Sequence, residues 1–165
     1  MTLAPLAALN AKSSTHNPAR AVSRLIADAG FDDHDRDIGT FGLCGTFALA
    51  LHARLSEAGI TAVPVLAHVG KVPTDLAQIS WRHALIEVAG VLFDIEGDIE
   101  PEDALANYCW GTTAPEVGLL RLSIDDFSAI IQRTRNAYDP SWHAQWTKTL
   151  RFPTLDDAPT IEHCE

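Results

Sequence analysis

Cysteine is scarce in this sequence, and its scarcity excludes a class of small stapled proteins. Only three cysteines occur among 165 residues, at Cys44, Cys109 and Cys164. An odd number cannot all pair within one chain, and no two of them have the CxxC spacing. A disulfide framework also needs denser cysteine in a shorter chain. We therefore expect a protein of a reducing compartment.

Basic residues and long apolar runs are also few. Lys and Arg number 12 against 22 Asp and Glu, giving a formal net charge of −10, and no basic stripe is present to bind phosphates. The acidity favours neutral or basic substrates. No apolar run approaches the roughly 20 residues that cross a bilayer. We expect neither a nucleic-acid nor a membrane partner.

The N-terminus lacks the pattern of a cleavable signal. Segment 3–9 is apolar, but no Lys or Arg precedes it and Pro5 interrupts it. A signal peptide combines a positive start with a longer apolar run. We therefore expect a cytoplasmic protein, with export as an effector without a cleavable signal as the alternative. Residues 1–16 are expected to form a loose arm, and residues 17–165 a single domain of ordinary hydrophobic content, 47%.

Capping residues, periodicity and turn residues indicate helices first, strands next and helices again. The predicted elements are a helix from Asn17 to Gly30, a polar loop over 31–42, a helix from Cys44 to Gly59, a strand over 60–69, strands over 83–88 and 91–95, and helices beginning at Pro101 and Ser123. Pro64 demotes part of its strand to an edge or a bulge. This order predicts an α+β fold with an antiparallel sheet.

The two short strands predict a close pair of polar side chains. Ala89-Gly90 is expected to join them in a tight turn. Alternation along the strands then makes His83 and Asp94 diagonal neighbours on one face. Glu96 would lie directly opposite His83 and is the rival carboxylate. A slip of one residue would send His83 and Asp94 to opposite faces.

Cys44 is predicted to open an apolar helix. A helix N-terminus and an adjacent imidazolium are the surroundings that activate a thiol as a nucleophile. Gly42, Leu43 and Gly45 flank Cys44, and small residues there let a substrate carbonyl approach backbone amides that can hold an oxyanion. Substrate-binding residues are therefore expected to be Gly42, Leu43, Gly45, Trp81 and Glu96, with packing on the sheet as the alternative role of Trp81.

Three motifs together carry a resemblance to a known family. They are Gly-Leu-Cys-Gly-Thr-Phe-Ala over 42–48, His-Ala-Leu-Ile-Glu-Val over 83–88 and Leu-Phe-Asp over 92–94. In this order they resemble the papain-like cysteine-enzyme superfamily, and within it the transglutaminase-like branch. The resemblance implies a Cys-bearing helix packed on an antiparallel sheet that bears His and Asp. It also implies a catalytic triad of Cys44, His83 and Asp94, a thioester acyl-enzyme and no cofactor.

Several functions remain open for this catalytic domain. The expected function is hydrolysis of an amide bond in a peptide, a protein or a small amide, as in a peptidase, amidase or deamidase. Acyl transfer to an amine and a non-enzymatic adaptor on the same fold are the alternatives. The same three residues are also a possible zinc ligand set. The acidic run 32–37 fails as a calcium loop because Ile38 stands where glycine is required.

Overall fold

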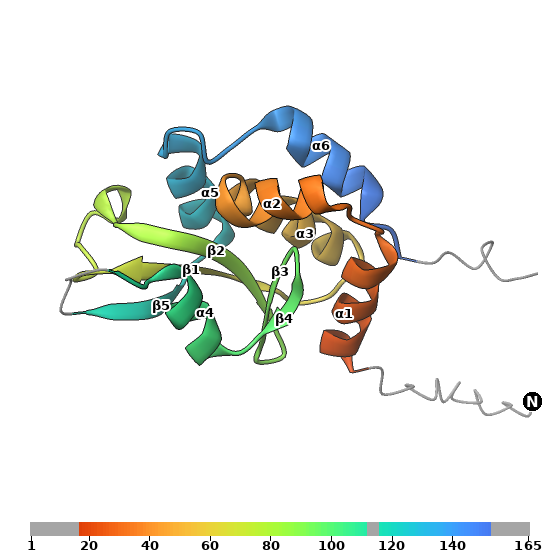
Figure 1. The fold of residues 1–165 in the computed structure, drawn as a ribbon, viewed down its shortest axis with the longest axis horizontal. Helices are drawn as coiled ribbons and strands as arrows, with labels where there is room; N and C mark the ends of the chain where they lie inside the picture. The colour runs from red at the N-terminus through yellow and green to blue at the C-terminus, as the bar shows by residue number, and fades with distance from the viewer. Residues whose placement is uncertain (1–16, 112–115, 153–165) are drawn as a thin grey trace, which may run out of the picture.

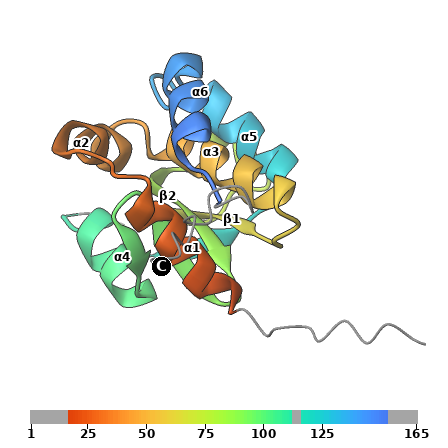
Figure 2. The same ribbon diagram turned by 90° about the vertical axis from the view of Figure 1, so that its right-hand side faces the viewer.

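One antiparallel sheet organises the molecule. The structure, a computed structural model, describes residues 17–111 and 116–152, so the expected arm 1–16 lies outside the described residues. Five strands are ordered β4-β3-β2-β1-β5, each antiparallel to its neighbours. The predicted α+β class with an antiparallel sheet is confirmed. Helices cover both faces, with α4 on the opposite side from α3, α5 and α6 (Figures 1 and 2).

The described elements alternate along the chain. They are α1 (Pro18–Asp28), α2 (Asp33–Phe41), α3 (Cys44–Glu57), β1 (Val63–Val69), the 3-10 turn η1 (Leu76–Gln78), β2 (Trp81–Val88), β3 (Val91–Asp94), β4 (Gly97–Ile99), α4 (Pro101–Tyr108), β5 (Val117–Arg121), α5 (Ile124–Arg133) and α6 (Pro140–Thr149). The strands β4 and β5 and the helix α6 were not predicted. β4 has only three residues, and the sequence after Tyr138, where α6 lies, has no steady apolar period.

The two faces of the sheet bury different side chains because successive residues of a strand point to opposite sides. Leu66 and Ile86 join the main core beneath α3. Val65 and Leu85 point the other way and pack against Ala104 of α4. The sheet is therefore buried on both faces, and α4 covers the side that carries the buried polar pair at the ends of β2 and β3.

Helix α3 is the centre of the main core. Its residues from Cys44 to Leu51 are all buried, as expected of a helix that is apolar on all sides. Gly45 lies so close to α5 that a Cβ there would stand 2.6 Å from Cδ1 of Ile131.

Within the described ranges, no single helix is long and apolar enough to cross a membrane. Only α2 and α3 taken together, across a bend of 105° between them, pass the test of length and composition.

The predicted hairpin is confirmed. Val88 pairs with Val91 and Ile86 pairs with Phe93, the register that a two-residue loop at Ala89-Gly90 requires. Both loop residues have positive φ, 50° and 83°, which is the conformation of the twist-matched hairpin turn. The register places the polar ends of the two strands beside one another.

The predicted polar loop over 31–42 is wrong, because most of it is helix α2. Asp32 accepts a hydrogen bond from the Asp35 N–H at 2.8 Å, and the Asp35 carboxylate accepts one from the Asp32 N–H. This reciprocal pair is a capping box at a helix N-terminus. The indole of Trp146 also donates to Asp35 at 3.0 Å and connects α2 to α6. The aspartates start a helix.

Pro64 was predicted to lie at an edge or a bulge, and the structure places it in an interior strand, one residue outside the ladder with β5. Pro64 is the second residue of β1, which lies between β2 and β5 in the interior of the sheet. Its carbonyl accepts the N–H of Leu122 at 2.9 Å, just beyond Arg121, the last residue of β5. The N and C=O of a strand residue face the same neighbour. The nitrogen of Pro64 carries no hydrogen to donate. It therefore lies on the side where β5 has already ended, and the strand ladder does not require a donor there.

The close approach of α3 and α5 makes Gly45→Ala a test of this packing. We expect Gly45→Ala to lower the free energy of unfolding by about 1–3 kcal/mol, because the added methyl overpacks the core. Gly42→Ala is the control, since a Cβ there meets nothing closer than the Ile38 carbonyl at 3.6 Å. Urea denaturation measures both variants. In a protein that also carries Ile131→Ala, we expect Gly45→Ala to lower the free energy of unfolding by less. An equal loss in both backgrounds would show that Gly45 and Ile131 are not in close contact.

Candidate active site

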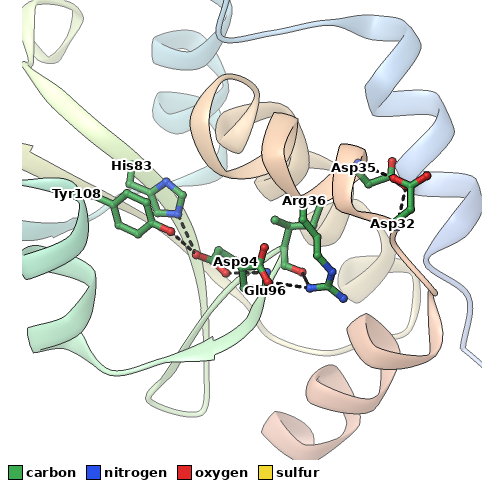
Figure 3. Close-up of polar contacts among 8 residues, drawn as sticks. Asp32, Asp35, Arg36, His83, Asp94, Glu96 and Tyr108 are labelled. Carbon is green, nitrogen blue, oxygen red and sulfur yellow. Dashed lines mark hydrogen bonds and ion pairs between the residues drawn. The ribbon is translucent and has the colours of Figure 1, made fainter.

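A buried histidine and a buried aspartate meet across the hairpin. Nε2 of His83 in β2 lies 3.1 Å from Oδ2 of Asp94, the last residue of β3 (Figure 3). Their side chains are 0% and 3% exposed. The predicted diagonal pairing of these residues is confirmed. A buried charged group is stable only when it is paired, so this contact ties the two strands together.

Tyr108, the last residue of α4, covers the pair. Its ring stacks on the His83 ring with centroids 3.5 Å apart and planes at 9°, and its hydroxyl donates to Asp94 Oδ2 at 3.1 Å (Figure 3). Burial, followed by the charge of Asp94, raises the pKa of Tyr108, so this hydroxyl stays protonated and donates. The sequence predicted the helix but carried no signal for this role, because the contact joins residues distant in the chain.

Glu96 does not compete with Asp94 for His83. The chain turns after β3, so Glu96 is not opposite His83 as predicted. Its N–H donates to the second Asp94 oxygen at 2.8 Å, and its exposed carboxylate pairs with Arg36 of α2 at 3.0 Å. Asp94 is therefore held by three donors, counting the His83 ring and the Tyr108 hydroxyl (Figure 3). The role of Glu96 is to hold the turn.

Cys44 influences the charge of the His83 ring. Nε2 is occupied by Asp94, whereas the buried Nδ1 has no hydrogen-bond partner among the described residues. Cys44 is nevertheless one of the two groups that bind the imidazolium form of His83 and raise its pKa. The sulfur therefore lies near the His83 ring, although no hydrogen bond joins it to Nδ1.

The pKa of His83 is the sum of opposing effects. Burial disfavours the charged ring and is the largest single influence. The hydrogen bond to Asp94 and the electrostatic interactions with Cys44 and Asp94 outweigh it and raise the pKa to about 9. At neutral pH the ring is therefore an imidazolium bonded to the Asp94 carboxylate.

The N-terminus of α3 has amides available for a ligand. Its N-cap residue is Leu43, which makes no side-chain capping bond. Four other described helices are capped by side chains, namely those of Asn17, Asp32, Ser123 and Asp139. The first N–H groups of a helix have no partner within it. The first turn of α3, which begins at Cys44, is thus a source of free donors beside the thiol.

A cavity of about 520 Å³ opens above the thiol. This volume lies within the range of small-molecule sites. The lining comes from four places: 40–42 with Cys44, Trp81–Arg82, the end of α4 with Asn107, Tyr108 and Trp110, and the loop 134–137. Of the expected substrate-binding residues, Gly42 and Trp81 line it. Leu43, Gly45 and Glu96 do not, and Gly45 serves instead to admit Ile131.

A bulge in β2 directs the side chains of Trp81 and His83 to opposite faces of the sheet. Ala67 pairs with His83, but the next residue, His68, pairs with Trp81, so Arg82 is the extra residue. A bulge redirects side chains and is common next to active sites. Trp81 consequently packs toward the main core and donates its indole N–H to Thr134 at 3.2 Å. His83 keeps the opposite face, with Tyr108 and Asp94.

The loop 134–137 is held against α3 by a buried hydroxyl. Thr46 of α3 is fully buried; it donates to the Ala137 carbonyl at 3.0 Å and accepts from the Asp139 N–H at 3.0 Å. One side chain in the first turn of the Cys44 helix thus positions the far wall of the cavity.

The remaining cysteines and the metal alternative receive less support. Cys109 is buried, its sulfur is 3.9 Å from the His68 carbonyl, and burial raises its pKa. Cys164 lies outside the described residues. No three His, Cys, Asp or Glu side chains of the described ranges are arranged to hold a metal ion. The zinc alternative at Cys44, His83 and Asp94 therefore has no matching geometry.

The raised pKa of His83 predicts how stability depends on pH. The unfolded ring titrates near 6.5 and the folded ring near 9, so the protonated ring stabilises the fold. Its contribution is complete below about pH 6.5 and is lost as the pH rises through about 9. NMR titration of the ring and urea denaturation across this range measure the effect.

Two variants control this titration. His83→Gln, which assigns the resonance, removes the pH dependence between 6.5 and 9. Cys44→Ser lowers the pKa of His83, because the sulfur is one of the groups that raises it. A ring that titrates at or below 6.5 in the wild-type protein, or that does not respond to Cys44→Ser, would contradict the arrangement.

Tyr108→Phe tests the hydroxyl without removing the stacked ring. We expect it to lower the free energy of unfolding by about 1.5–3 kcal/mol, because a hydrogen bond to a carboxylate is lost. Tyr138→Phe is the matched control, since no hydrogen bond of its hydroxyl occurs within the described residues. Equal effects of the two substitutions in urea denaturation would show that the Tyr108 hydroxyl does not stabilise Asp94.

Comparison with known proteins gives no family or function for this chain. A scan against protein-family models found no match, and neither a curated protein nor a solved structure matches the chain. The resemblance of the three motifs to papain-like enzymes therefore remains a resemblance, and the residues of the site are the ground on which a function can be proposed.

Proposed function

We propose that this protein is a cysteine enzyme that hydrolyses an amide through a thioester acyl-enzyme. Cys44 is the nucleophile, His83 the general acid and base, and Asp94 the residue that orients the ring. The observation that carries the proposal is the buried His83–Asp94 bond, with the other ring nitrogen left for a thiol that lines a cavity. The proposed architecture is papain-like, of the transglutaminase-like branch.

Acylation uses the imidazolium that the raised pKa of His83 provides. The sulfur of Cys44 attacks the substrate carbonyl, a C–S bond forms, and the oxygen takes the negative charge. Free N–H groups in the first turn of α3 donate to that oxygen. Nδ1 of His83 then gives its proton to the amide nitrogen as the C–N bond breaks. The amine leaves, and Cys44 carries the acyl group.

Hydrolysis of the thioester reverses these roles. The now neutral His83 takes a proton from a water molecule, whose oxygen attacks the thioester carbonyl. The C–S bond breaks, the acid is released, and the thiolate and imidazolium are restored. Asp94 keeps Nε2 occupied throughout, so that Nδ1 always faces the sulfur. Tyr108 keeps bulk water away from this pair.

The reactivity of Cys44 tests the proposal. We expect iodoacetamide to alkylate Cys44 at least about tenfold faster than Cys109 at neutral pH, because only Cys44 has an imidazolium beside it. p-Nitrophenyl acetate is expected to acetylate Cys44, and peptide mass spectrometry identifies the residue. His83→Ala is expected to slow acetylation by about a hundredfold or more, as loss of a general acid and base does.

His52→Ala is the matched control, because His52 lies within α3 and away from the cavity lining. Circular dichroism verifies that both variants are folded. Added glycinamide distinguishes hydrolysis from acyl transfer, since a transferase yields the acetylated amine. Equal, slow labelling of Cys44 and Cys109 in the wild-type protein would refute the enzyme and favour an adaptor.

A further inference from the structure

The cavity above Cys44 is positively lined in a strongly acidic protein. Arg82 and Arg135 are among its lining residues, and no Asp or Glu is. The whole chain has a formal net charge of −10, so a lining without carboxylates is not a reflection of composition. The buried carboxylate of Asp94 is already paired with His83. The cavity therefore presents uncompensated positive charge.

Both arginines are exposed, and neither makes an ion pair with a described residue. Three arginines of the described ranges are paired, Arg36 with Glu96, Arg54 with Glu57 and Arg121 with Glu87; Arg82 and Arg135 are the unpaired ones that line the cavity. A guanidinium is a planar fork of donors that matches a carboxylate. The two unpaired forks at one cavity are available for a ligand.

The backbone holds the two arginines next to the reacting groups. Arg82 is the bulged residue of β2 and directly precedes His83. Arg135 directly follows Thr134, whose hydroxyl accepts the Trp81 indole N–H at 3.2 Å. The other end of that loop is bonded to Thr46, two residues after Cys44. Both arginines thus lie on segments of the cavity wall whose backbone is held in place by hydrogen bonds or strand pairing.

The cavity also has an apolar rim. Phe41 and Trp110 are 82% and 77% exposed and line the cavity. They are two of the four large hydrophobic residues that are exposed within the described ranges. Exposed apolar side chains that gather at one place mark a binding surface. An apolar or aromatic group of a ligand can lie against them while its charge meets the arginines.

We propose that the site selects amides that carry a carboxylate close to the scissile bond, flanked by an apolar group. Arg82 and Arg135 bind the carboxylate, and Phe41 and Trp110 contact the apolar part. This inference rests on the proposed function, and it deepens it by naming the substrate class. It differs from the expectation from net charge, which favoured neutral or basic substrates, because the local lining and not the total charge faces the ligand.

Charged thiol reagents test the lining without a known substrate. The carboxyethyl, trimethylammonioethyl and methyl methanethiosulfonates differ in charge and share one reaction. The Cys44 sulfur attacks the reagent sulfur, an S–S bond forms, and methanesulfinate leaves. The rates at Cys44 are followed by peptide mass spectrometry. We expect the wild-type protein to react faster with the carboxyethyl reagent than with the trimethylammonioethyl reagent.

Removing one arginine isolates its contribution. We expect Arg82→Gln and Arg135→Gln each to lower the ratio of anionic to cationic rates by about three- to tenfold, the effect of a unit charge at short range. The rate with the uncharged methyl reagent measures any change in the intrinsic reactivity of the thiol, and this change cancels in the ratio. Arg24→Gln on α1, outside the lining, makes the same change in net charge and alters the ratio by less than about twofold because salt screens it.

The outcomes separate the inference from the proposed function. An anionic preference that Arg24→Gln reduces as much as the cavity variants, or no preference at all, would overturn the inference. Protection of Cys44 by glutarate more than by inorganic phosphate at equal ionic strength supports a carboxylate, and the reverse order overturns that assignment. Failure of p-nitrophenyl acetate to acetylate Cys44 would instead contradict the proposed function, since the thiosulfonates need only a thiol that the cavity reaches.

Discussion

The hydrogen bond between His83 and Asp94 is the interaction on which the rest of the structure depends. It joins two buried polar groups at 3.1 Å across the β2–β3 hairpin. A charged pair in the interior is destabilising unless its members satisfy one another. The hairpin register, the Glu96 N–H and the Tyr108 hydroxyl all serve Asp94. The hairpin, the turn after β3 and the end of α4 therefore all contact or position the Asp94 carboxylate.

This constraint also determines which nitrogen of His83 is left for chemistry. With Nε2 occupied, Nδ1 is the nitrogen that remains, and it is buried with no hydrogen-bond partner among the described residues. The sulfur comes from a helix whose N-cap, Leu43, offers no side-chain acceptor. Thr46 in the same first turn holds the opposite wall of the cavity. The proposed nucleophile, the free amides and the hydroxyl that holds the cavity wall therefore all belong to α3.

Local patterns predicted the parts of the fold that local physics decides. Ala89-Gly90 predicted the turn, and alternation then placed His83 beside Asp94, because a two-residue loop leaves only one register. The aspartates of 32–37 were misread as loop, since a capping box and a solvated acidic run have the same composition. Glu96 was misplaced because the sequence does not show where β3 ends and the chain turns into β4.

The other missing features are contacts between distant segments. Tyr108 at the end of α4 stacks on His83 of β2, and no periodicity encodes a contact between separate elements. The bulge at Arg82 depends on the pairing of β1 with β2. Arg135 joins the cavity only because Thr46 and Trp81 hold its loop. Each of these requires the tertiary structure, and together they make the cavity lining.

A crystal structure of the protein acetylated by p-nitrophenyl acetate tests the central claim most directly. We predict an acetyl group on the Cys44 sulfur, its oxygen accepting hydrogen bonds from the first turn of α3, and Nδ1 of His83 beside the thioester. An adduct on Cys109, or a Cys44 sulfur that points into the apolar core while His83 faces away from it, would contradict the claim.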